Sequence, residues 1–310
     1  MIQAGIDSEQ FGIKQRAPFV VLYHGGCPDG ITSAWVFHRI DGNSNDRFIP
    51  CQHSDTELPE GLENEIVYVV DFSFSRELVK KLCSIAKQVV ILDHHASAQR
   101  ELDGLEKEIE NFGYIFDMNR SGAQIAWDYI NPEVLYPWFV SVTAARDLWK
   151  WNIYHGSKAY SKALNFERWY TFDKLDELFQ MSFSSSSHEE GMFEHLESLG
   201  ETLLEIDQEL IEDAVRKSTL VRFMDKYTIR MGNCPSYLRS EVGHELAKME
   251  DAEFSATWAY DFVSDQWWIS LRGDDDTDLS KIAELYGGGG HPKACGFTIK
   301  ENLHTLFKPL

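Results

Sequence analysis

The sequence predicts an α/β protein whose first part is built on a parallel β-sheet. Three short apolar runs, Pro18–Tyr23, Ile66–Val70 and Val89–Leu92, lie within the first hundred positions. None of them alternates polar and apolar residues, which is typical of a strand covered on both faces of a parallel sheet. Stretches of helical composition at 31–40 and 76–87 lie between these runs. This alternation of strand and helix predicts right-handed βαβ units.

Carboxylate, imidazole or thiol side chains follow the end of each predicted strand. They are His24, Cys27 and Asp29 after the first, Asp71 after the second, and Asp93, His94 and His95 after the third. Ligands of open parallel sheets bind at the carboxyl ends of the strands, so we expect these groups to meet in one crevice. Aspartate and histidine without paired cysteines favour a catalytic divalent cation, Mn²⁺ or Mg²⁺, over structural zinc. Taken alone, the triplet at 93–95 is also compatible with a plain polar loop.

Composition limits the classes of protein that this chain can represent. Its 310 residues, 43% of them hydrophobic, suffice for one large domain or two moderate ones. No apolar stretch approaches the roughly 20 residues of a membrane span, and we see no secretory signal. Five cysteines without a CxxC pair indicate reduced thiols, so we expect a cytoplasmic location and no membrane partner. The formal net charge of −21 argues against binding long duplexes, whereas a small anionic substrate remains compatible with it.

The middle of the chain predicts two further helices. The aromatic-rich segment 131–151 contains Asp147 among apolar neighbours, and a buried carboxylate needs a partner. Asp147 is therefore either paired with an arginine in the core or a metal ligand. A serine run at 182 and 184–187 resembles the start of a linker, and a long amphipathic helix follows it. Its apolar positions have roughly heptad spacing: Leu196, Leu199, Leu203, Ile206 and Leu210. We expect this helix to pack between two domains, and a homodimer contact is the alternative.

From about residue 219 the pattern changes to that of a second, smaller α/β domain. The segments 254–262 and 267–271 alternate around a short connection and predict a β-hairpin. The acidic cluster at 274–278 can cap a following helix at about 278–286.

Four consecutive glycines, 287–290, end that helix and precede His291 and Lys293. Such a run costs conformational entropy, which a plain turn rarely justifies. Its amides can cradle a phosphate, with Arg272 nearby in the sequence. A flexible loop is the plainer interpretation.

Together these motifs resemble the DHH phosphoesterase family, specifically its RecJ-like and nanoRNase-like oligoribonuclease members. Asp93-His94-His95 is the triplet that names the family, and Gly288-Gly-Gly-His291 resembles the GGGH signature of its C-terminal DHHA1 domain. Asp29-Gly-Ile-Thr-Ser, Asp71 and Arg146-Asp147-Leu-Trp are similar to the first, second and fourth motifs, and 240–247 is similar to DHHA1 sequences. The matches run in the family's order from about residue 18 to 299.

The resemblance implies a division into two domains. A loose arm at 1–17 would precede a Rossmann-like DHH catalytic domain at 18–186. A connecting helix at 187–218 would lead to a smaller DHHA1 substrate-binding domain at 219–310. The active site would lie in the cleft between the domains.

The resemblance also implies a metal centre. The ligands of one divalent cation, usually Mn²⁺, would be Asp29, Asp71, His94 and Asp147. Asp71 would bridge to a second cation, with His24 as a further ligand. Cys27 stands where relatives have an aspartate, and His24 is one residue farther from Asp29 than in the common spacing. Thiolate suits Mn²⁺ or Mg²⁺ poorly. The second site would therefore be weak, altered in metal choice or empty, and Cys27 is alternatively a loop residue without a ligand role.

The chemistry implied is hydrolysis of a phosphoester by metal-activated water. His95 and Asp93 would form the catalytic pair. His95 would act on the phosphate, and Asp93 would orient the His95 ring. Arg272, Gly288, Gly289, Gly290 and His291 would bind the substrate. The substrates implied are short single-stranded nucleic acids, dinucleotides or related nucleotide phosphoesters. A non-catalytic nucleotide sensor with a degraded second metal site, or a pyrophosphatase or polyphosphatase, is the alternative.

Overall fold

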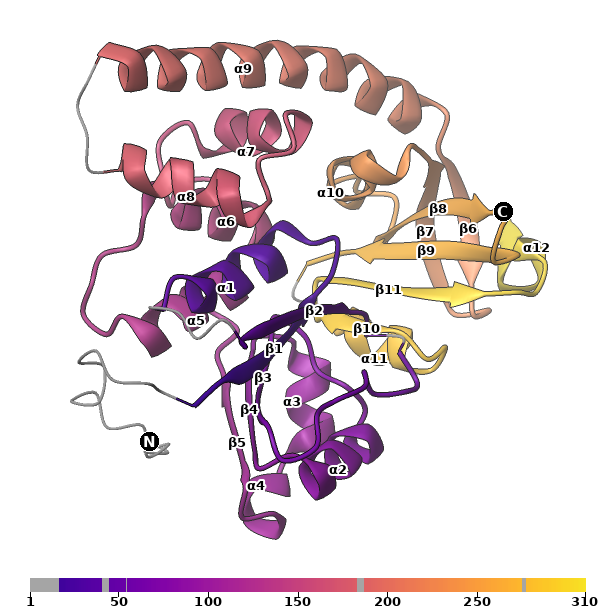
Figure 1. The fold of residues 1–310 in the computed structure, drawn as a ribbon. Helices are drawn as coiled ribbons and strands as arrows, with labels where there is room; N and C mark the ends of the chain where they lie inside the picture. Colours follow the sequence, from indigo (N-terminus) through magenta and orange to yellow (C-terminus); the bar gives the residue numbers. More distant parts are fainter. Residues whose placement is uncertain (1–16, 41–44, 54, 183–186, 275–276) are drawn as a thin grey trace. The chain divides into compact units, whose positions relative to one another are not determined.

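A computed structural model describes residues 17–40, 45–53, 55–182, 187–274 and 277–310 (Figure 1). The chain divides into two compact units, Met1–Leu203 and Leu204–Leu310, and helix α9 (Ser187–Arg216) continues from the first into the second. The predicted arm lies outside the described residues except for Ala17, as do serines 184–186 of the predicted linker and positions 275–276 of the acidic cluster. None of the helices in the described ranges is long and apolar enough to cross a bilayer.

The first unit contains a five-stranded sheet in which every neighbouring pair is parallel. Its order is β2-β1-β3-β4-β5. The strands are β1 (Phe19–His24), β2 (Arg47–Cys51), β3 (Ile66–Val70), β4 (Gln88–Asp93) and β5 (Phe112–Phe116). The predicted α/β class with a parallel sheet is confirmed, and the three predicted runs become β1, β3 and β4. The two edge strands, β2 and β5, were not predicted.

Helices cover both faces of this sheet. They are α1 (Pro28–His38), α2 (Arg76–Ile85), α3 (Ala96–Leu102), α4 (Leu105–Glu108), α5 (Gly122–Ile130), α6 (Trp138–Asp147), α7 (Ser157–Phe166) and α8 (Phe172–Met181). Alternate residues of β1 enter different cores: Phe19 and Val21 pack with α1, α5 and α6, whereas Val20 and Leu22 pack with α2, α3 and α4. Burial on both faces explains why the strand sequences are continuously apolar.

Two helices differ from their predicted bounds. Helix α1 begins at Pro28 rather than 31, because proline suits the first turn of a helix and Cys27 is the N-cap. The predicted helix 131–151 is limited to α6, Trp138–Asp147. Asn131 is the C-cap of α5, Pro137 is the N-cap of α6, and Trp149 has a φ of +56° that ends the helical conformation.

The second unit is built on a seven-stranded sheet of order β10-β11-β9-β8-β7-β6-β12. Its strands are β6 (Thr219–Phe223), β7 (Tyr227–Asn233), β8 (Ser255–Asp261), β9 (Gln266–Arg272), β10 (Gly289–His291), β11 (Ala294–Ile299) and β12 (Phe307–Pro309). Its helices are η2 (Ser236–Leu238), α10 (Arg239–Ala247), α11 (Leu279–Glu284) and α12 (Leu303–Leu306). Strands β7 and β8 are parallel and the other pairs are antiparallel. The predicted hairpin is β8–β9.

Helix α9 buries different parts of its apolar stripe in each unit. Leu196 is fully buried in the core of the first unit, and Ile211 packs in a cluster of the second. Ile206 and Leu210, between these positions, are 54% and 43% exposed. The predicted homodimer contact stays a prediction.

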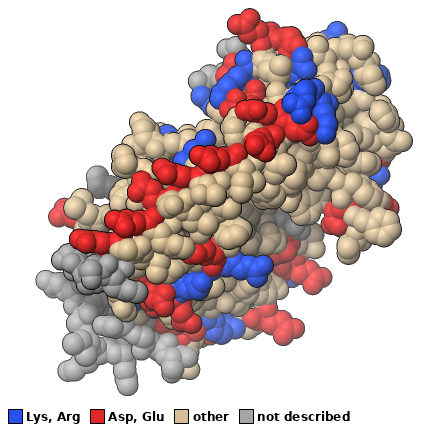
Figure 2. Space-filling model, turned by 90° about the horizontal axis from the view of Figure 1, so that it is seen from above, with Lys and Arg blue, Asp and Glu red and all other residues tan. Residues whose placement is uncertain are grey.

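Acidic side chains form a row along the exposed face of α9 (Figure 2). They are Glu190, Glu194, Glu201, Glu205, Glu209 and Glu212. This solvated face accounts for part of the large negative charge of the chain.

Candidate metal centre

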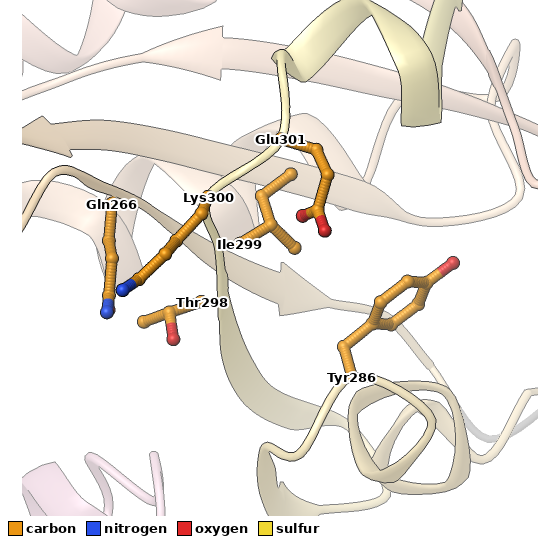
Figure 3. Close-up of a pocket in the computed structure, with 6 residues that line it drawn as sticks. All are labelled: Gln266, Tyr286, Thr298, Ile299, Lys300 and Glu301. Carbon is orange, nitrogen blue, oxygen red and sulfur yellow. The ribbon is translucent and has the colours of Figure 1, made fainter.

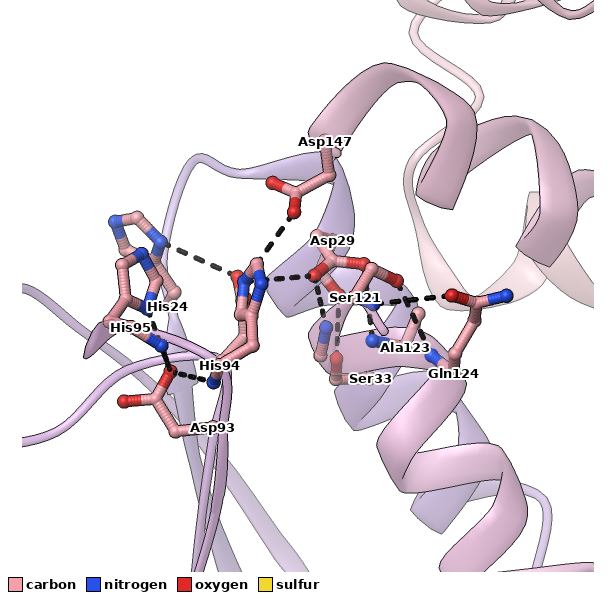
Figure 4. Close-up of polar contacts among 12 residues, drawn as sticks. His24, Asp29, Ser33, Asp93, His94, His95, Ser121, Ala123, Gln124 and Asp147 are labelled. Atoms are coloured by element: carbon pink, nitrogen blue, oxygen red, sulfur yellow. Dashed lines mark hydrogen bonds and ion pairs between the residues drawn. The ribbon is translucent and has the colours of Figure 1, made fainter. Parts of the chain in front are cut away.

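Four of the predicted ligands surround one point at the carboxyl ends of the strands of the first unit (Figure 4). The Nε2 atom of His94 lies 3.1 Å from Asp71 Oδ1, 3.5 Å from Asp147 Oδ2 and 3.7 Å from Asp29 Oδ2. The side chains of His94, Asp29 and Asp71 are at most 1% exposed, and that of Asp147 is 24% exposed. Strand ends and helix ends that are far apart in the sequence therefore converge as the parallel sheet predicts.

A second group of donors adjoins the first. One ligand atom each of His24, Cys27 and Asp71 lie within 4.8 Å of one another, and His24 Nδ1 is 3.5 Å from Asp71 Oδ2. Asp71 thus belongs to both groups, with Oδ1 directed at His94 and Oδ2 at His24. We call Asp29, His94 and Asp147 with Asp71 the buried group, and His24, Cys27 and Asp71 the loop group.

The unsatisfied oxygens of these groups fit a divalent cation. Among the described residues, Asp71 Oδ2 and Asp147 Oδ2 are buried without a hydrogen-bond partner. Buried carboxylates are costly unless a cation or a donor compensates them. Three carboxylates face one imidazole here, so the buried group carries excess negative charge, and oxygen and imidazole donors suit a hard or borderline divalent ion.

The pKa shifts of these side chains in the absence of a metal ion also favour a cation at this position. Burial, followed by the charges of Asp71 and Asp147, raises the pKa of Asp29 well above its usual range. Burial opposes ionisation of Asp71, but the neighbouring imidazoles of His24 and His94 hold its pKa well below the usual range. Burial also opposes the charge on His94, yet the surrounding carboxylates raise its pKa well above the ordinary value. The raised pKa of His94 thus reflects the negative charge that a bound cation would offset.

The backbone of the site is strained at Asp71. Its φ is +61°, in the left-handed region that residues other than glycine seldom adopt. The amide of Asp71 donates to Leu92 O at 2.9 Å, which ties this residue to β4. Strain of this kind persists only where the surrounding structure fixes it, and it is found most often at functional sites.

The N-terminus of α5 holds Asp29 in place. The amides of Gly122 and Ala123 donate to its two carboxylate oxygens at 2.6 and 3.1 Å. Amides at a helix N-terminus are well suited to an anion. A Cβ added to Gly122 would lie 2.7 Å from both Cβ and Oδ1 of Asp71, so a larger residue does not fit.

The sequence prediction missed this contribution. The available signal was the capping box, in which Ser121 accepts from the amide of Gln124 and Gln124 accepts from that of Ser121. A capping box marks a helix start, although it does not say what the first amides bind.

Asp93 orients His95 instead of joining the buried group. His95 Nδ1 lies 2.7 Å from Asp93 Oδ1, which also accepts the amide of His94 at 2.7 Å. The hydroxyl of Ser73 donates to Asp93 Oδ2 at 2.7 Å. Burial opposes the charge on His95, but the Asp93 carboxylate raises the pKa of the imidazole. Asp93 is thus an ionised carboxylate paired with His95.

A third imidazole near the loop group was not predicted. His53 lies on the turn after β2, and its ring centroid is 4.8 Å from those of both His24 and His95 in edge-to-face arrangements. The signal was its position directly after a strand, which was missed because β2 itself was missed.

In the second unit the glycine run is more regular than predicted. Gly289–His291 forms strand β10, paired with β11, rather than a loop. A Cβ at Gly288 would lie 2.1 Å from Gly296 O, so close backbone approach already requires glycine at this position. Arg272 ends β9, and its Nη2 donates to Ser240 Oγ at 2.8 Å. The substrate roles of Arg272, Gly288–Gly290 and His291 stay predictions.

A shallow surface pocket of about 390 Å³ also lies in the second unit (Figure 3). Its lining residues are Gln266, Tyr286, Thr298, Ile299, Lys300 and Glu301. None of the predicted site residues lines it, and we assign it no role in the chemistry.

Comparisons with known proteins show what the chain is similar to. No family model matches the chain. It is 27% identical over 302 residues to Uncharacterized protein R106 of Acanthamoeba polyphaga mimivirus, covering 90% of this chain and 67% of that protein. It is also 27% identical over 267 residues to Oligoribonuclease NrnB of Bacillus subtilis, covering 80% of this chain and 63% of that protein. These similarities support the resemblance to the DHH family. The chain spans about two thirds of the length of these curated relatives.

The fold agrees with the resemblance to the DHH family. A solved DHH domain, from a member of a family of ribosomal proteins, superposes with a TM-score of 0.57 at 14% identity. The match covers 91% of this chain and 83% of that one. The family resemblance predicted from the sequence is therefore confirmed.

Proposed function

We propose that this protein is a DHH-type, metal-dependent phosphodiesterase that hydrolyses short single-stranded oligonucleotides, dinucleotides or related nucleotide phosphoesters. The observation that carries the proposal is the buried group, in which the carboxylates of Asp29, Asp71 and Asp147 surround His94 Nε2. The similarity to a protein named an oligoribonuclease supports this substrate class. We propose Mn²⁺ or Mg²⁺ for the buried group, because its donors are oxygen and imidazole nitrogen.

The buried group would hold the cation, and His95 would act beside it. A bound divalent cation supplies charge neutralisation at phosphate oxygens and a lowered pKa for water. Asp93 holds His95 through Nδ1 at 2.7 Å and favours its protonated form. A protonated imidazole stabilises the negative charge of a phosphoryl group or gives a proton to the leaving oxygen. The Ser73 hydroxyl fixes Asp93, which in turn fixes the ring.

Charge favours a short substrate over a long one. Each added phosphate brings another negative charge toward a chain whose formal net charge is −21. Affinity for long nucleic acids depends on many basic contacts with phosphates. In our proposal Arg272 and the segment Gly288–His291 bind the substrate, so that a few local contacts suffice.

A Mn²⁺-dependent assay tests the proposal. The panel contains a linear dinucleotide, a short and a long RNA, a cyclic dinucleotide, 3′-phosphoadenosine phosphate and pyrophosphate, with His94→Ala as the blank. We expect release of mononucleotide from the short substrates and none in the blank. Binding of dinucleotide without turnover under every metal would favour a nucleotide sensor, and release of orthophosphate from pyrophosphate alone would favour a pyrophosphatase. Activity that survives His94→Ala would contradict the assigned metal centre.

A further inference from the structure

We propose that the loop group is a zinc site, in which the thiolate of Cys27 selects Zn²⁺ over Mn²⁺ and Mg²⁺. The protein would then hold two different metals side by side, one in each group. This inference rests on the proposed function and its metal centre. It extends them, because it assigns a different ion to the loop group, which shares Asp71 with the buried group.

The donor set of the loop group is that of a zinc site with an open position. Zinc in catalytic sites takes three protein ligands from cysteine, histidine and carboxylate, and leaves the fourth to water or substrate. His24, Cys27 and Asp71 supply one nitrogen, one sulfur and one oxygen within 4.8 Å of one another. Mn²⁺ and Mg²⁺ prefer oxygen, and thiolate is a soft ligand that favours zinc.

The distance between the ligand atoms of His24 and Asp71 already suits a zinc ion. Two ligands at about 2.0–2.1 Å from a tetrahedral zinc lie about 3.3 Å apart. His24 Nδ1 and Asp71 Oδ2 are 3.5 Å apart. The side chain of Asp71 is 1% exposed, and its Oδ2 atom is buried without a hydrogen-bond partner among the described residues. An unsatisfied buried carboxylate oxygen is therefore directed into the loop group.

The loop that carries His24 and Cys27 is fixed by the protein itself. The amide of Gly25 donates to Cys51 O at 2.9 Å, and Gln52 Nε2 donates to Gly25 O at 2.9 Å. A Cβ on Gly30 would lie 2.2 Å from His24 O, so the start of α1 packs directly against the end of β1. Because the backbone is held on both sides, the two ligands keep their spacing before an ion binds.

Cys27 also differs from the other four cysteines. Those at 51, 83, 234 and 295 are buried in hydrophobic clusters, with at most 7% exposure, whereas Cys27 is partly exposed. A metal ion bound to the sulfur would also offset the negative charge of the neighbouring Asp71 carboxylate. The other cysteines fill space in the core, and Cys27 is placed among metal-binding donors.

Metal exchange on the full chain tests the assignment without using catalysis. The protein is loaded with one equivalent of Zn²⁺, dialysed against excess Mn²⁺, and analysed for both elements. We expect the wild-type protein to retain zinc, and Cys27→Asp to exchange it for manganese with a preference lowered by about 100-fold or more. Cys83→Ala is the matched control, because it removes a buried thiol outside both groups, and it should retain zinc like the wild type.

Cobalt supplies a spectroscopic test of the sulfur ligand. Co²⁺ bound to a thiolate gives a sulfur-to-metal charge-transfer band in the near ultraviolet. We expect this band in the wild type and in Cys83→Ala, and its loss in Cys27→Ser. Near-ultraviolet circular dichroism of each metal-free variant checks that the fold is intact.

The outcomes separate this inference from the proposed function. Zinc retention equal in the wild type and Cys27→Asp, together with no charge-transfer band, would overturn the zinc site. Mn²⁺-dependent hydrolysis by the same samples would still support the proposed phosphodiesterase function. Conversely, a cobalt–thiolate band in a protein that hydrolyses none of the substrates would support the zinc site while the proposed function fails.

Discussion

The two donor groups share Asp71 yet differ in burial and in the origin of their ligands. In the buried group, His94 and Asp29 are at most 1% exposed and follow a strand end and a helix start that are both packed on the sheet. In the loop group, His24 is 23% exposed and Cys27 is partly exposed, and the short turn between β1 and α1 separates them. A turn can change one ligand without disturbing the packed strands. In our proposal, the packed strand and helix ends hold the hard cation, and the turn supplies the donors that select a different ion.

We expect the largest effect from removing His94. This substitution disrupts the buried group and leaves the loop group in place. His94→Ala removes the imidazole that the carboxylates of the buried group surround. We expect the Mn²⁺-dependent kcat/KM to fall by about 10³-fold or more, since a catalytic cation provides several kcal/mol of charge stabilisation. Zinc bound by the loop group should be retained.

Steady-state kinetics and metal analysis on the same samples measure both effects. His155→Ala, at an exposed position, is the control and should behave as the wild type. A fall of less than tenfold in His94→Ala would mean that the buried group does not hold the catalytic ion.

Gly122→Ala should damage both groups at once, because it acts on the residue that they share. The new Cβ would lie 2.7 Å from Asp71 Oδ1 and 3.0 Å from Asp29 Oδ2. Displacing ligands by a fraction of an ångström should lower kcat/KM by about 100-fold and reduce the content of both metals.

Gly191→Ala is the matched control, because nothing lies within 4 Å of its added Cβ in helix α9. It should retain activity and metal, with a free energy of unfolding unchanged or raised by up to about 1 kcal/mol. Normal metal content in Gly122→Ala would show that the two groups tolerate movement of Asp71.

The stabilisation that Mn²⁺ gives should increase with pH. The surrounding carboxylates raise the pKa of His94 above its ordinary value, so its proton stabilises the metal-free fold at low pH. That stabilisation is lost as the pH rises through the raised pKa of the folded state. Mn²⁺ needs the neutral ring and competes with the proton, so its apparent affinity should rise by up to about tenfold per pH unit below that pKa.

Thermal unfolding with and without Mn²⁺ across this pH range measures the effect. The Tm of the metal-free protein should fall with rising pH, and the rise in Tm on adding Mn²⁺ should grow. In His94→Ala, the Mn²⁺-induced rise in Tm should not increase with pH in this way. A Mn²⁺ effect that is independent of pH would contradict competition at His94.

The sequence predicted the parts of the site that depend on strand order. Apolar runs locate β1, β3 and β4, and parallel strands bring their carboxyl ends together, so Asp71 and His94 could be placed in one site. For Asp147 the sequence left two interpretations, a core ion pair with an arginine or a metal ligand. The pattern of its helix does not indicate which group its carboxylate contacts. The structure places its Oδ2 3.5 Å from His94 Nε2.

The parts that escaped prediction depend on backbone contacts between distant segments. The amides of Gly122 and Ala123 bind Asp29 across more than ninety positions of sequence, and no local pattern encodes that pairing. Edge strand β2 is short and includes an arginine and a proline, so it and the adjacent His53 were missed. The glycine run was interpreted as a phosphate cradle or a flexible loop, whereas part of it forms strand β10 and packs closely against Gly296; its phosphate role stays a prediction.

The smallest effect should come from Ser73, which supports His95 without touching either donor group. Ser73→Ala removes the hydroxyl that donates to the buried Asp93 Oδ2 at 2.7 Å. The unsatisfied oxygen should lower the free energy of unfolding by about 1–3 kcal/mol. Because Asp93 Oδ1 still holds His95, kcat should fall by only about two- to fivefold, and the content of both metals should stay unchanged. Ser84→Ala, which removes an exposed hydroxyl bound to Lys81 O, is the control for stability. A loss of either metal in Ser73→Ala would mean that Asp93 supports the ligands themselves, so that the catalytic pair and the donor groups act as one unit.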